Sequence, residues 1–148
     1  MSGKFRTVSL FLIGAMFMLA VKAHHGWSQW DFAVYLDAAR AVRQGINPYA
    51  DPTSPELRNL TILTRYVYPP MFARVLAPFS VLPEEILRFA WLALHALSFE
   101  ALYWLGLLLF GRRFGWISWI LFHLIGMRYD GVETDFRAGN TALMEAAV

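Results

Sequence analysis

The feature that most constrains the fold is a long apolar stretch between Pro83 and Gly111. Pro83-Glu84-Glu85 is a typical helix start, because proline suits the first turn and acidic side chains are favoured near the positive end of the helix dipole. Residues 86–110, which follow, are mostly apolar. As a helix they would measure about 37 Å, enough to cross roughly 30 Å of hydrocarbon with some tilt. The sequence therefore predicts a membrane-spanning helix over residues 86–110.

The composition of the whole chain points to the same class. Of its 148 residues, 57% are hydrophobic and 16% are charged, whereas ordinary soluble domains have roughly 45–50% and about 25%. A net charge of +2 is too small to indicate nucleic-acid binding, and the absence of cysteine excludes disulfides and thiolate metal sites. We therefore expect an all-α integral membrane protein whose partners are the lipid bilayer and membrane-bound substrates, with no nucleic acid.

A second apolar run, residues 114–129, follows closely. The turn before it, Gly111-Arg112-Arg113, is short and basic, which favours an antiparallel hairpin whose turn lies in the cytoplasm. By length alone, residues 114–129 are short for a span. Beyond them the chain would return to the outer side, and a fourth helix is expected to begin at about residue 138. Because the sequence stops before that helix could cross, we expect the N-terminal part of a larger multi-span protein.

The N-terminal apolar run, residues 8–23, allows two interpretations. It is either a first span, with the N-terminus in the cytoplasm because Lys4 and Arg6 lie on that side, or a cleavable signal peptide. Both interpretations export the segment that follows. We therefore expect one multi-pass membrane domain over residues 1–148, in the cell inner (plasma) membrane, with residues 24–85 as a long external loop.

A short helix is expected near the start of this loop. It would run from about Asp31 to Gly45, since glycine commonly closes helices. On a 3.6-residue period, Asp31 falls on the packed side with Tyr35. Asp37 falls on the solvent-exposed face with Arg40, with which it can form an i,i+3 ion pair. We therefore expect a packed Asp31 and a solvated Asp37.

Two consecutive prolines mark a second feature of the loop. In Tyr66-Val67-Tyr68-Pro69-Pro70 the prolines fix the backbone and keep Tyr68 out of the helical region, so this is a rigid corner that aims the tyrosine side chains. Residues 71–77 follow, ending near Pro78. They form either a short amphipathic helix that lies against the bilayer or a plain connector.

Glu100 and His123 are ionisable side chains deep inside the apolar runs. An unpaired ionised group there costs several kcal/mol. Counted from the basic turn, both lie about 14 Å from the cytoplasmic side, so the hairpin is expected to pair them. The alternative is a neutral Glu100 that is hydrogen-bonded to a serine or a backbone carbonyl. His95 shares a helix face with Arg88, so we expect it instead at the external opening of the membrane domain.

The order of these motifs resembles that of a known family. A first span is followed by Asp31-Phe-x-Val-Tyr35, Gly45-x-x-Pro48-Tyr49, Tyr68-Pro69-Pro70, Pro78 and Leu82-Pro83. From about Val8 to Asn140, this pattern resembles the polyprenyl-phosphate-sugar-dependent glycosyltransferases of the mannosyltransferase type related to glycosyltransferase family 87. The resemblance implies a GT-C-like membrane fold, with N-terminal spans and a long external loop carrying short amphipathic helices. In that family the Asp that opens the Asp-Phe-x-Val-Tyr motif is the catalytic base, a role that carries over to Asp31.

The resemblance also implies the reaction. A sugar, expected to be mannose, would pass from a polyprenyl-phosphate donor to a hydroxyl of an extracytoplasmic glycan or glycolipid, with no cofactor and no metal. A carboxylate within hydrogen-bond reach of that hydroxyl can take its proton as attack develops, which suits Asp31. The residues alone leave open that Asp31 is simply the N-cap of its helix.

Further candidates follow from the substrates. The lipid phosphate is negative and calls for arginine or backbone N–H donors. The candidate phosphate-binding residues are Arg65, Arg74 and Arg137. The candidate sugar- or lipid-binding residues are Tyr35, Tyr66, Tyr68 and Asn140, the last because Gly139-Asn140 resembles the family's Gly-Gln-x-Asn-like segment without its Gln. Trp27 and Trp30 could also stack on a sugar, although tryptophans often form an aromatic belt at the membrane surface.

Other classes of protein fit the same pattern. One is a small non-catalytic membrane protein for interaction or assembly. Another is a truncated, inactive remnant, and a third is a cleaved, exported protein anchored by a hairpin over residues 86–127. As a glycosyltransferase, the 148 residues would cover only about the first third of such an enzyme, so we expect the chain to be inactive by itself.

Overall fold

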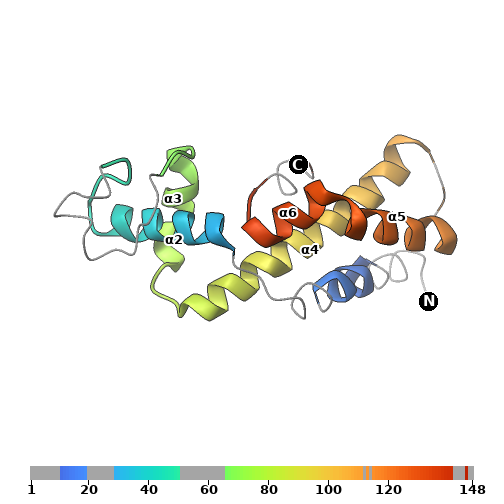
Figure 1. Cartoon of the computed structure of the whole chain (residues 1–148), viewed down its shortest axis with the longest axis horizontal. Coiled ribbons are helices and arrows are strands. Elements are labelled where there is room, and N and C mark those ends of the chain that lie inside the picture. The colour runs from blue at the N-terminus through green and yellow to red at the C-terminus, as the bar shows by residue number, and fades with distance from the viewer. Residues whose placement is uncertain are drawn as a thin grey trace. The chain divides into compact units, whose positions relative to one another are not determined.

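The computed structural model describes residues 11–19, 29–50, 66–111, 113, 115–141 and 146. Across these ranges every regular element is helical and no strand occurs (Figure 1). The helices are residues 11–19, α2 (Trp30–Arg43), α3 (Pro70–Leu76), the 3-10 helix η1 (Ala77–Phe79), α4 (Glu84–Leu109), α5 (Trp116–Arg128) and α6 (Asp130–Ala138). The all-α part of the predicted fold is therefore confirmed for the described residues.

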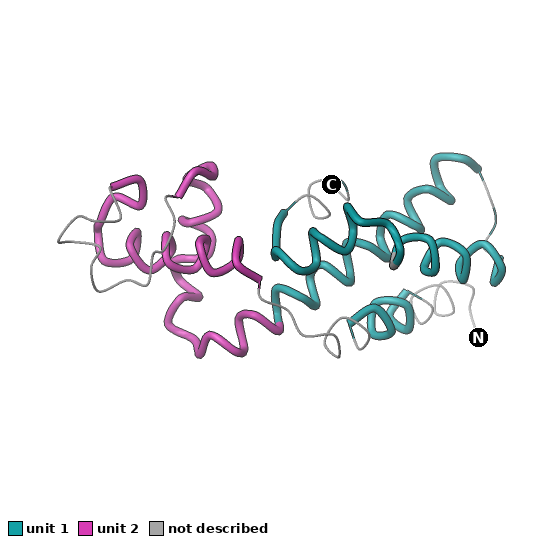
Figure 2. Tube along the Cα trace, in the orientation of Figure 1, with its two compact units in different colours: residues 1–28, 90–148 teal, residues 29–89 magenta. Residues whose placement is uncertain are grey.

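The chain divides into two compact units (Figure 2). One, which we call the loop unit, comprises residues 29–89 and nearly coincides with the expected external loop. The other, the hairpin unit, comprises residues 1–28 and 90–148. Each unit has its own buried side chains and its own polar contacts.

Helix α4 supplies the length that a membrane span needs. It begins directly after Pro83, has Glu84 and Glu85 in its first turn, and contains 26 residues. Among the described residues it is the one helix long and apolar enough to cross a membrane. Helix α5 has 13 residues, about 20 Å of helix, which is short for roughly 30 Å of hydrocarbon. The run expected over residues 8–23 is described only over 11–19.

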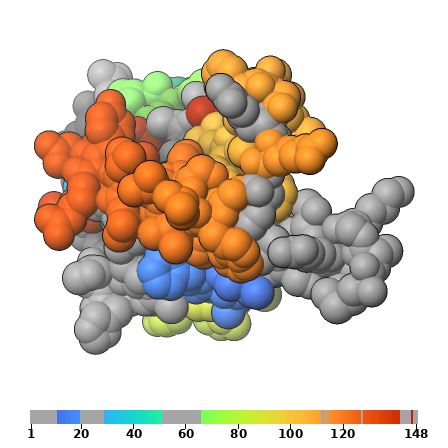
Figure 3. All heavy atoms as spheres, turned by 90° about the vertical axis from the view of Figure 1, so that its right-hand side faces the viewer, coloured from blue at the N-terminus to red at the C-terminus, as the bar shows by residue number. Residues whose placement is uncertain are grey.

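The core of the hairpin unit gathers side chains from several helices. Its buried apolar residues are Met18, Leu19, Leu92, Ala96, Phe99 and Phe136. Figure 3 shows a face where the helix at 11–19 and α5 lie side by side, with the Phe17 ring edge-on to the His123 ring at 6.3 Å. The hairpin therefore packs together with a third helix.

Helix α6 had not been predicted. The segment after Arg128 was interpreted only as a return to the outer side, but residues 130–138 are helical. Gly139 closes the helix at φ 71°, a left-handed conformation that glycine adopts at low cost. Residues 139–141 are not helical, and most of the fourth helix expected from about residue 138 lies outside the described part of the chain.

Helix α2 forms as predicted, but the predicted exposure of one of its charged side chains is wrong. The helix ends at Arg43, and Gly45 follows with φ 74°. The expectation that Asp37 is solvated was wrong, because Asp37 is buried. Periodicity alone does not show this burial, in which Asp37 keeps its ion pair with Arg40 of the same helix and Arg40 in turn contacts Glu84 of α4.

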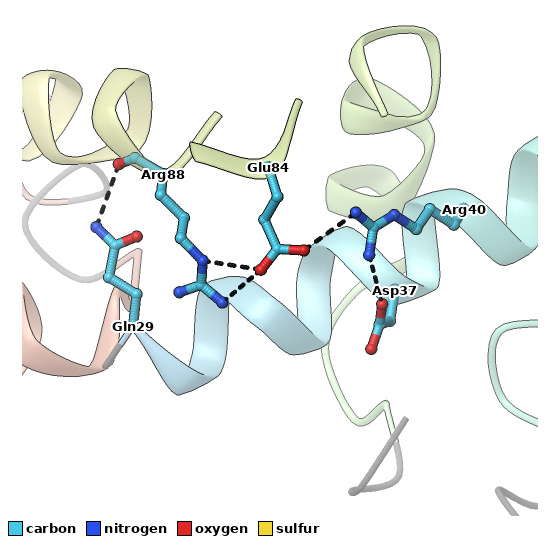
Figure 4. A network of polar contacts seen from close by, with 5 residues as sticks. All are labelled: Gln29, Asp37, Arg40, Glu84 and Arg88. Carbon is cyan, nitrogen blue, oxygen red and sulfur yellow. Dashed lines mark hydrogen bonds and ion pairs between the residues drawn. The ribbon is translucent and has the colours of Figure 1, made fainter. Parts of the chain in front are cut away.

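Those partners form the polar network of the loop unit, which we define as Asp37, Arg40, Glu84 and Arg88 (Figure 4). The predicted Asp37–Arg40 pair is confirmed, at 3.0 Å. Arg40 also lies 3.2 Å from Glu84, which in turn lies 2.8 Å from Arg88. Beside the network, the Gln29 side chain donates a hydrogen bond to the Arg88 carbonyl at 3.3 Å. The network thus joins α2 to the first turns of α4.

Candidate functional site

Asp31 lies in the first turn of α2 and is half-buried. The N-cap of this helix is Gln29, so the alternative role of Asp31 as the N-cap was wrong. A carboxylate in the first turn is still favoured by the positive end of the helix dipole. The side chain of Asp31 is therefore available for a partner other than its own backbone.

That partner is Tyr68, which lies at the two-proline corner. Burial raises the pKa of the Tyr68 hydroxyl, and so do a hydrogen bond with Asp31 and the charge of that carboxylate. The hydroxyl therefore stays protonated and donates to the carboxylate. The Tyr35 ring packs edge-on against the Tyr68 ring, with 4.5 Å between centroids. Three of the predicted site residues, Asp31, Tyr35 and Tyr68, are thus brought together.

The corner is held by two further tyrosines. The Tyr66 hydroxyl donates to the Pro69 carbonyl at 2.7 Å, and the Tyr49 hydroxyl donates to the Tyr68 carbonyl at 2.8 Å. The rings of Tyr49 and Tyr66 lie 5.3 Å apart, and those of Tyr66 and Tyr68 lie 5.9 Å apart. We call Tyr35, Tyr49, Tyr66 and Tyr68 the tyrosine cluster. Tyr49 had not been selected as a site residue, although its place in the Pro48-Tyr49 motif was a signal for it.

The members of the cluster differ in exposure. Tyr35 and Tyr66 are buried, at 0% and 2% exposed, whereas Tyr68 is half-buried and Tyr49 is 38% exposed. A sugar could therefore reach the rings of Tyr49 and Tyr68 but not those of Tyr35 and Tyr66. The two buried rings support the corner from behind.

The predicted phosphate-binding residues are distributed over both units. Arg74 is exposed on α3 in the loop unit, the unit that also contains Asp31. Arg137 is exposed on α6 and belongs to the hairpin unit, as does Asn140, whose side-chain oxygen accepts a hydrogen bond from the Thr141 backbone at 2.7 Å. Arg65 lies outside the described residues.

The predicted pairing of Glu100 with His123 is confirmed, since Nε2 of His123 lies 2.9 Å from Oε2 of Glu100. Neither of these two atoms makes a hydrogen bond, so we describe the pair by its distance alone. Oε1 of Glu100 accepts the indole N–H groups of Trp104 and Trp119, at 2.8 and 2.9 Å. The alternative of a Glu100 bonded to a serine or a backbone carbonyl was therefore wrong.

His95 forms a second buried pair in the hairpin unit. Because His95 is only 1% exposed, the expectation that it lies at an external opening was wrong. Its Nδ1 lies 2.9 Å from the Trp91 carbonyl, and its Nε2 contacts the Asn140 carbonyl. The Asp135 carboxylate lies 3.5 Å from Nε2. These contacts tie α4 to the end of α6 and explain why α6 is ordered there.

In the parts of the chain that the structure describes, no three His, Asp or Glu side chains are grouped so that they could hold a metal ion. A comparison with protein families gives one finding: the model of glycosyltransferase family 87 matches residues 66–148, more than half of the chain. The match includes Tyr66, Tyr68 and Arg74 and begins after Asp31. Neither the curated proteins nor the solved structures gave a match.

Proposed function

Because the chain belongs to glycosyltransferase family 87, we propose that Asp31 is the catalytic base of a sugar transfer. The family is typically membrane-associated, and its members act on a sugar donor and an acceptor. The proposed donor is a polyprenyl-phosphate sugar, with mannose as the sugar. The proposed acceptor is a hydroxyl of an extracytoplasmic glycan or glycolipid. The loop unit then lies outside the cell inner membrane, and the N-terminus lies in the cytoplasm.

The observation that carries this proposal is the hydrogen bond between Asp31 and Tyr68 beside two accessible tyrosine rings. In the reaction the acceptor oxygen forms a bond to the anomeric carbon, and the bond from that carbon to the phosphate oxygen breaks. The electron pair leaves with the polyprenyl phosphate, and the hydroxyl proton passes to Asp31. General-base catalysis of this kind contributes about 10²–10⁴-fold in rate.

Tyr68 orients the base in this mechanism. A carboxylate has two oxygens with about four acceptor positions, so Asp31 can accept the Tyr68 hydroxyl and the substrate hydroxyl together. The hydrogen bond from Tyr68 fixes the orientation of the Asp31 carboxylate. Tyr68 is a positioning residue, since it acts through Asp31.

The departing phosphate needs positive charge. Guanidinium groups form strong paired hydrogen bonds with phosphate oxygens. Arg74 lies in the same unit as Asp31 and is exposed, so it is the first candidate. Arg65, Arg137 and Asn140 are further proposed contacts to the donor.

The test is the Asp31→Asn change made at the matching position of a full-length homologue, assayed in membranes that contain it, with polyprenyl-phosphate-[³H]mannose as donor. We expect transfer to fall by about 10²–10⁴-fold because the amide cannot accept the proton. Asp37→Asn is the matched control, since Asp37 lies on the same helix in the polar network, and it should retain transfer. Membrane insertion of both variants is checked by fractionation. Unchanged turnover of Asp31→Asn would rule out the proposed base and favour a non-catalytic role.

A further inference from the structure

Two buried ionisable side chains of the hairpin unit, Glu100 and His123, take no part in the proposed reaction. Glu100 is 0% exposed and His123 is 2% exposed. Oε2 of Glu100 and Nε2 of His123 lie 2.9 Å apart, and neither atom has a hydrogen-bond partner. Buried polar atoms without a partner are uncommon, and each calls for an explanation such as a bound ion, a water molecule or a functional role.

The other polar atoms of these two side chains are already occupied. Oε1 of Glu100 accepts the indole N–H groups of Trp104 and Trp119. Nδ1 of His123 lies 2.9 Å from the Trp119 carbonyl, which can only accept, so Nδ1 carries a proton in this contact. Any further proton of the pair therefore lies on Nε2 or Oε2, the two atoms that face each other.

The surroundings offer no charge that could balance a charge on this pair. In the described part of the hairpin unit, the other buried ionisable side chains are His95 and Asp135. These two contact each other. The exposed Arg128 lies at the end of α5. The pair thus has no third buried ionisable group of its own among these residues.

The helix at residues 11–19 lies against the pair and adds no charge. A Cβ atom at Gly14 would clash with the carboxylate of Glu100, so the backbone of this helix lies directly against that carboxylate. The ring of Phe17 lies edge-on to the ring of His123. Residues 11–19 include no ionisable side chain. A net charge on the pair would therefore lie beneath an apolar helix.

The number of protons on Nε2 and Oε2 decides that net charge. Without a proton on either atom, the pair carries one negative charge and two lone pairs face each other. With a proton on both, it carries one positive charge and two donors face each other. With a single proton, the pair is neutral as a unit and a donor faces an acceptor. Because an unbalanced buried charge is strongly unfavourable, the single-proton state is the one that suits this site.

We propose that Glu100 and His123 form a binding site for one proton, which lies between Nε2 and Oε2 and belongs to the pair as a unit. The site keeps the hairpin unit uncharged where the helix at residues 11–19 packs on it. It goes beyond the proposed function, because it involves neither Asp31 nor a sugar donor.

The proton count can be measured directly by nuclear magnetic resonance. The full chain is labelled with ¹⁵N in histidine and ¹³C in the glutamate carboxyl group, and is studied in detergent micelles at neutral pH. The ¹⁵N shifts show which ring nitrogens of His123 are protonated, and the ¹³C shift shows whether Glu100 is. We expect one proton in total on Nε2 and the carboxyl group. A count of none or of two would show that the proposal is wrong.

Two single substitutions test whether neutrality of the pair fixes this count. In Glu100→Gln the pair is neutral only without a proton on Nε2, so we expect His123 to be protonated on Nδ1 alone. In His123→Gln we expect Glu100 to be protonated. Asp130→Asn removes an exposed carboxylate of the same unit and should leave both signals unchanged.

The opposite results would contradict the proposal. A doubly protonated His123 in Glu100→Gln, or an ionised Glu100 in His123→Gln, would mean that the site tolerates an unbalanced charge. If a variant does not fold, the count in the natural protein still decides. No substrate is present in these measurements, so their outcome is independent of the test of Asp31.

Discussion

The polar network of the loop unit and the Glu100–His123 pair of the hairpin unit use the same chemistry in different surroundings. Arg40 and Asp37 lie 3.0 Å apart, and Glu100 and His123 lie 2.9 Å apart. The side chain of Arg40 is 27% exposed, whereas that of Glu100 is 0% exposed. Exposed pairs contribute about 0.2–1 kcal/mol, while removing one partner of a buried pair costs about 3–5 kcal/mol. Equal distances therefore do not imply equal contributions to stability.

The largest expected effect comes from removing Glu100. Glu100→Ala leaves the indole N–H groups of Trp104 and Trp119 without their acceptor and His123 without its partner. We expect the free energy of unfolding in detergent micelles to fall by about 3–5 kcal/mol. Glu100→Gln keeps an acceptor for the indoles and should lose less. A loss within about 1 kcal/mol for Glu100→Ala would mean that the pair contributes no more than the half-buried network.

Gly14 provides a second way to probe the buried pair. A Cβ atom at this position would clash with the carboxylate of Glu100, which is fixed by two indoles. Gly14→Ala should destabilise the protein by about 1–3 kcal/mol. In the Glu100→Ala background the same change should cost less, because neighbouring sites couple. Gly106→Ala is the control, since nothing lies within 4 Å of its Cβ position.

The half-buried side of the comparison is tested by Arg40→Ala. It removes the contacts with Asp37 and Glu84, and we expect the free energy of unfolding to fall by about 1 kcal/mol. Arg43→Ala, an exposed change in the last turn of the same helix, should have a smaller effect. If Arg40→Ala destabilised as strongly as Glu100→Ala, the contrast between the two regions would disappear.

The smallest effect concerns pH. Burial raises the pKa of Asp37 above 3.8, and this outweighs the lowering by Arg40. The folded state then binds this proton more readily than the unfolded state, so the contribution of Asp37 to stability falls as pH rises from 3.8 through the folded pKa. Subtracting the unfolding profile of Asp37→Asn from that of the natural protein should leave this slope. A difference that rises with pH would mean that Arg40 dominates.

The sequence predicted the features that depend on local spacing. The start of α4 after Pro83, the end of α2 before Gly45 and the pairing of Glu100 with His123 all follow from helical rise and helix signals. The burial of Asp37 could not be predicted, because it depends on how α2 packs against α3 and η1, which lie more than 30 positions along the chain.

The same limit applies to α6 and to the site. His95 and Asp135 stabilise the end of α6 from a distant helix, and no local pattern shows that contact. Asp31 and the tyrosines were selected from the sequence, but the hydrogen bond of Asp31 with Tyr68 depends on how α2 and the two-proline corner pack. The three-dimensional contact, and not the motif, distinguishes Tyr68 from its neighbours.

The corner also has a geometric consequence. Along it, Tyr66 is buried, Val67 is exposed and Tyr68 is half-buried, so three consecutive residues have three different surroundings. The two prolines that follow fix the backbone that spaces them. A change that relaxed this backbone would disturb the packing of Tyr66 and the hydrogen bond of Tyr68 with Asp31 at the same time.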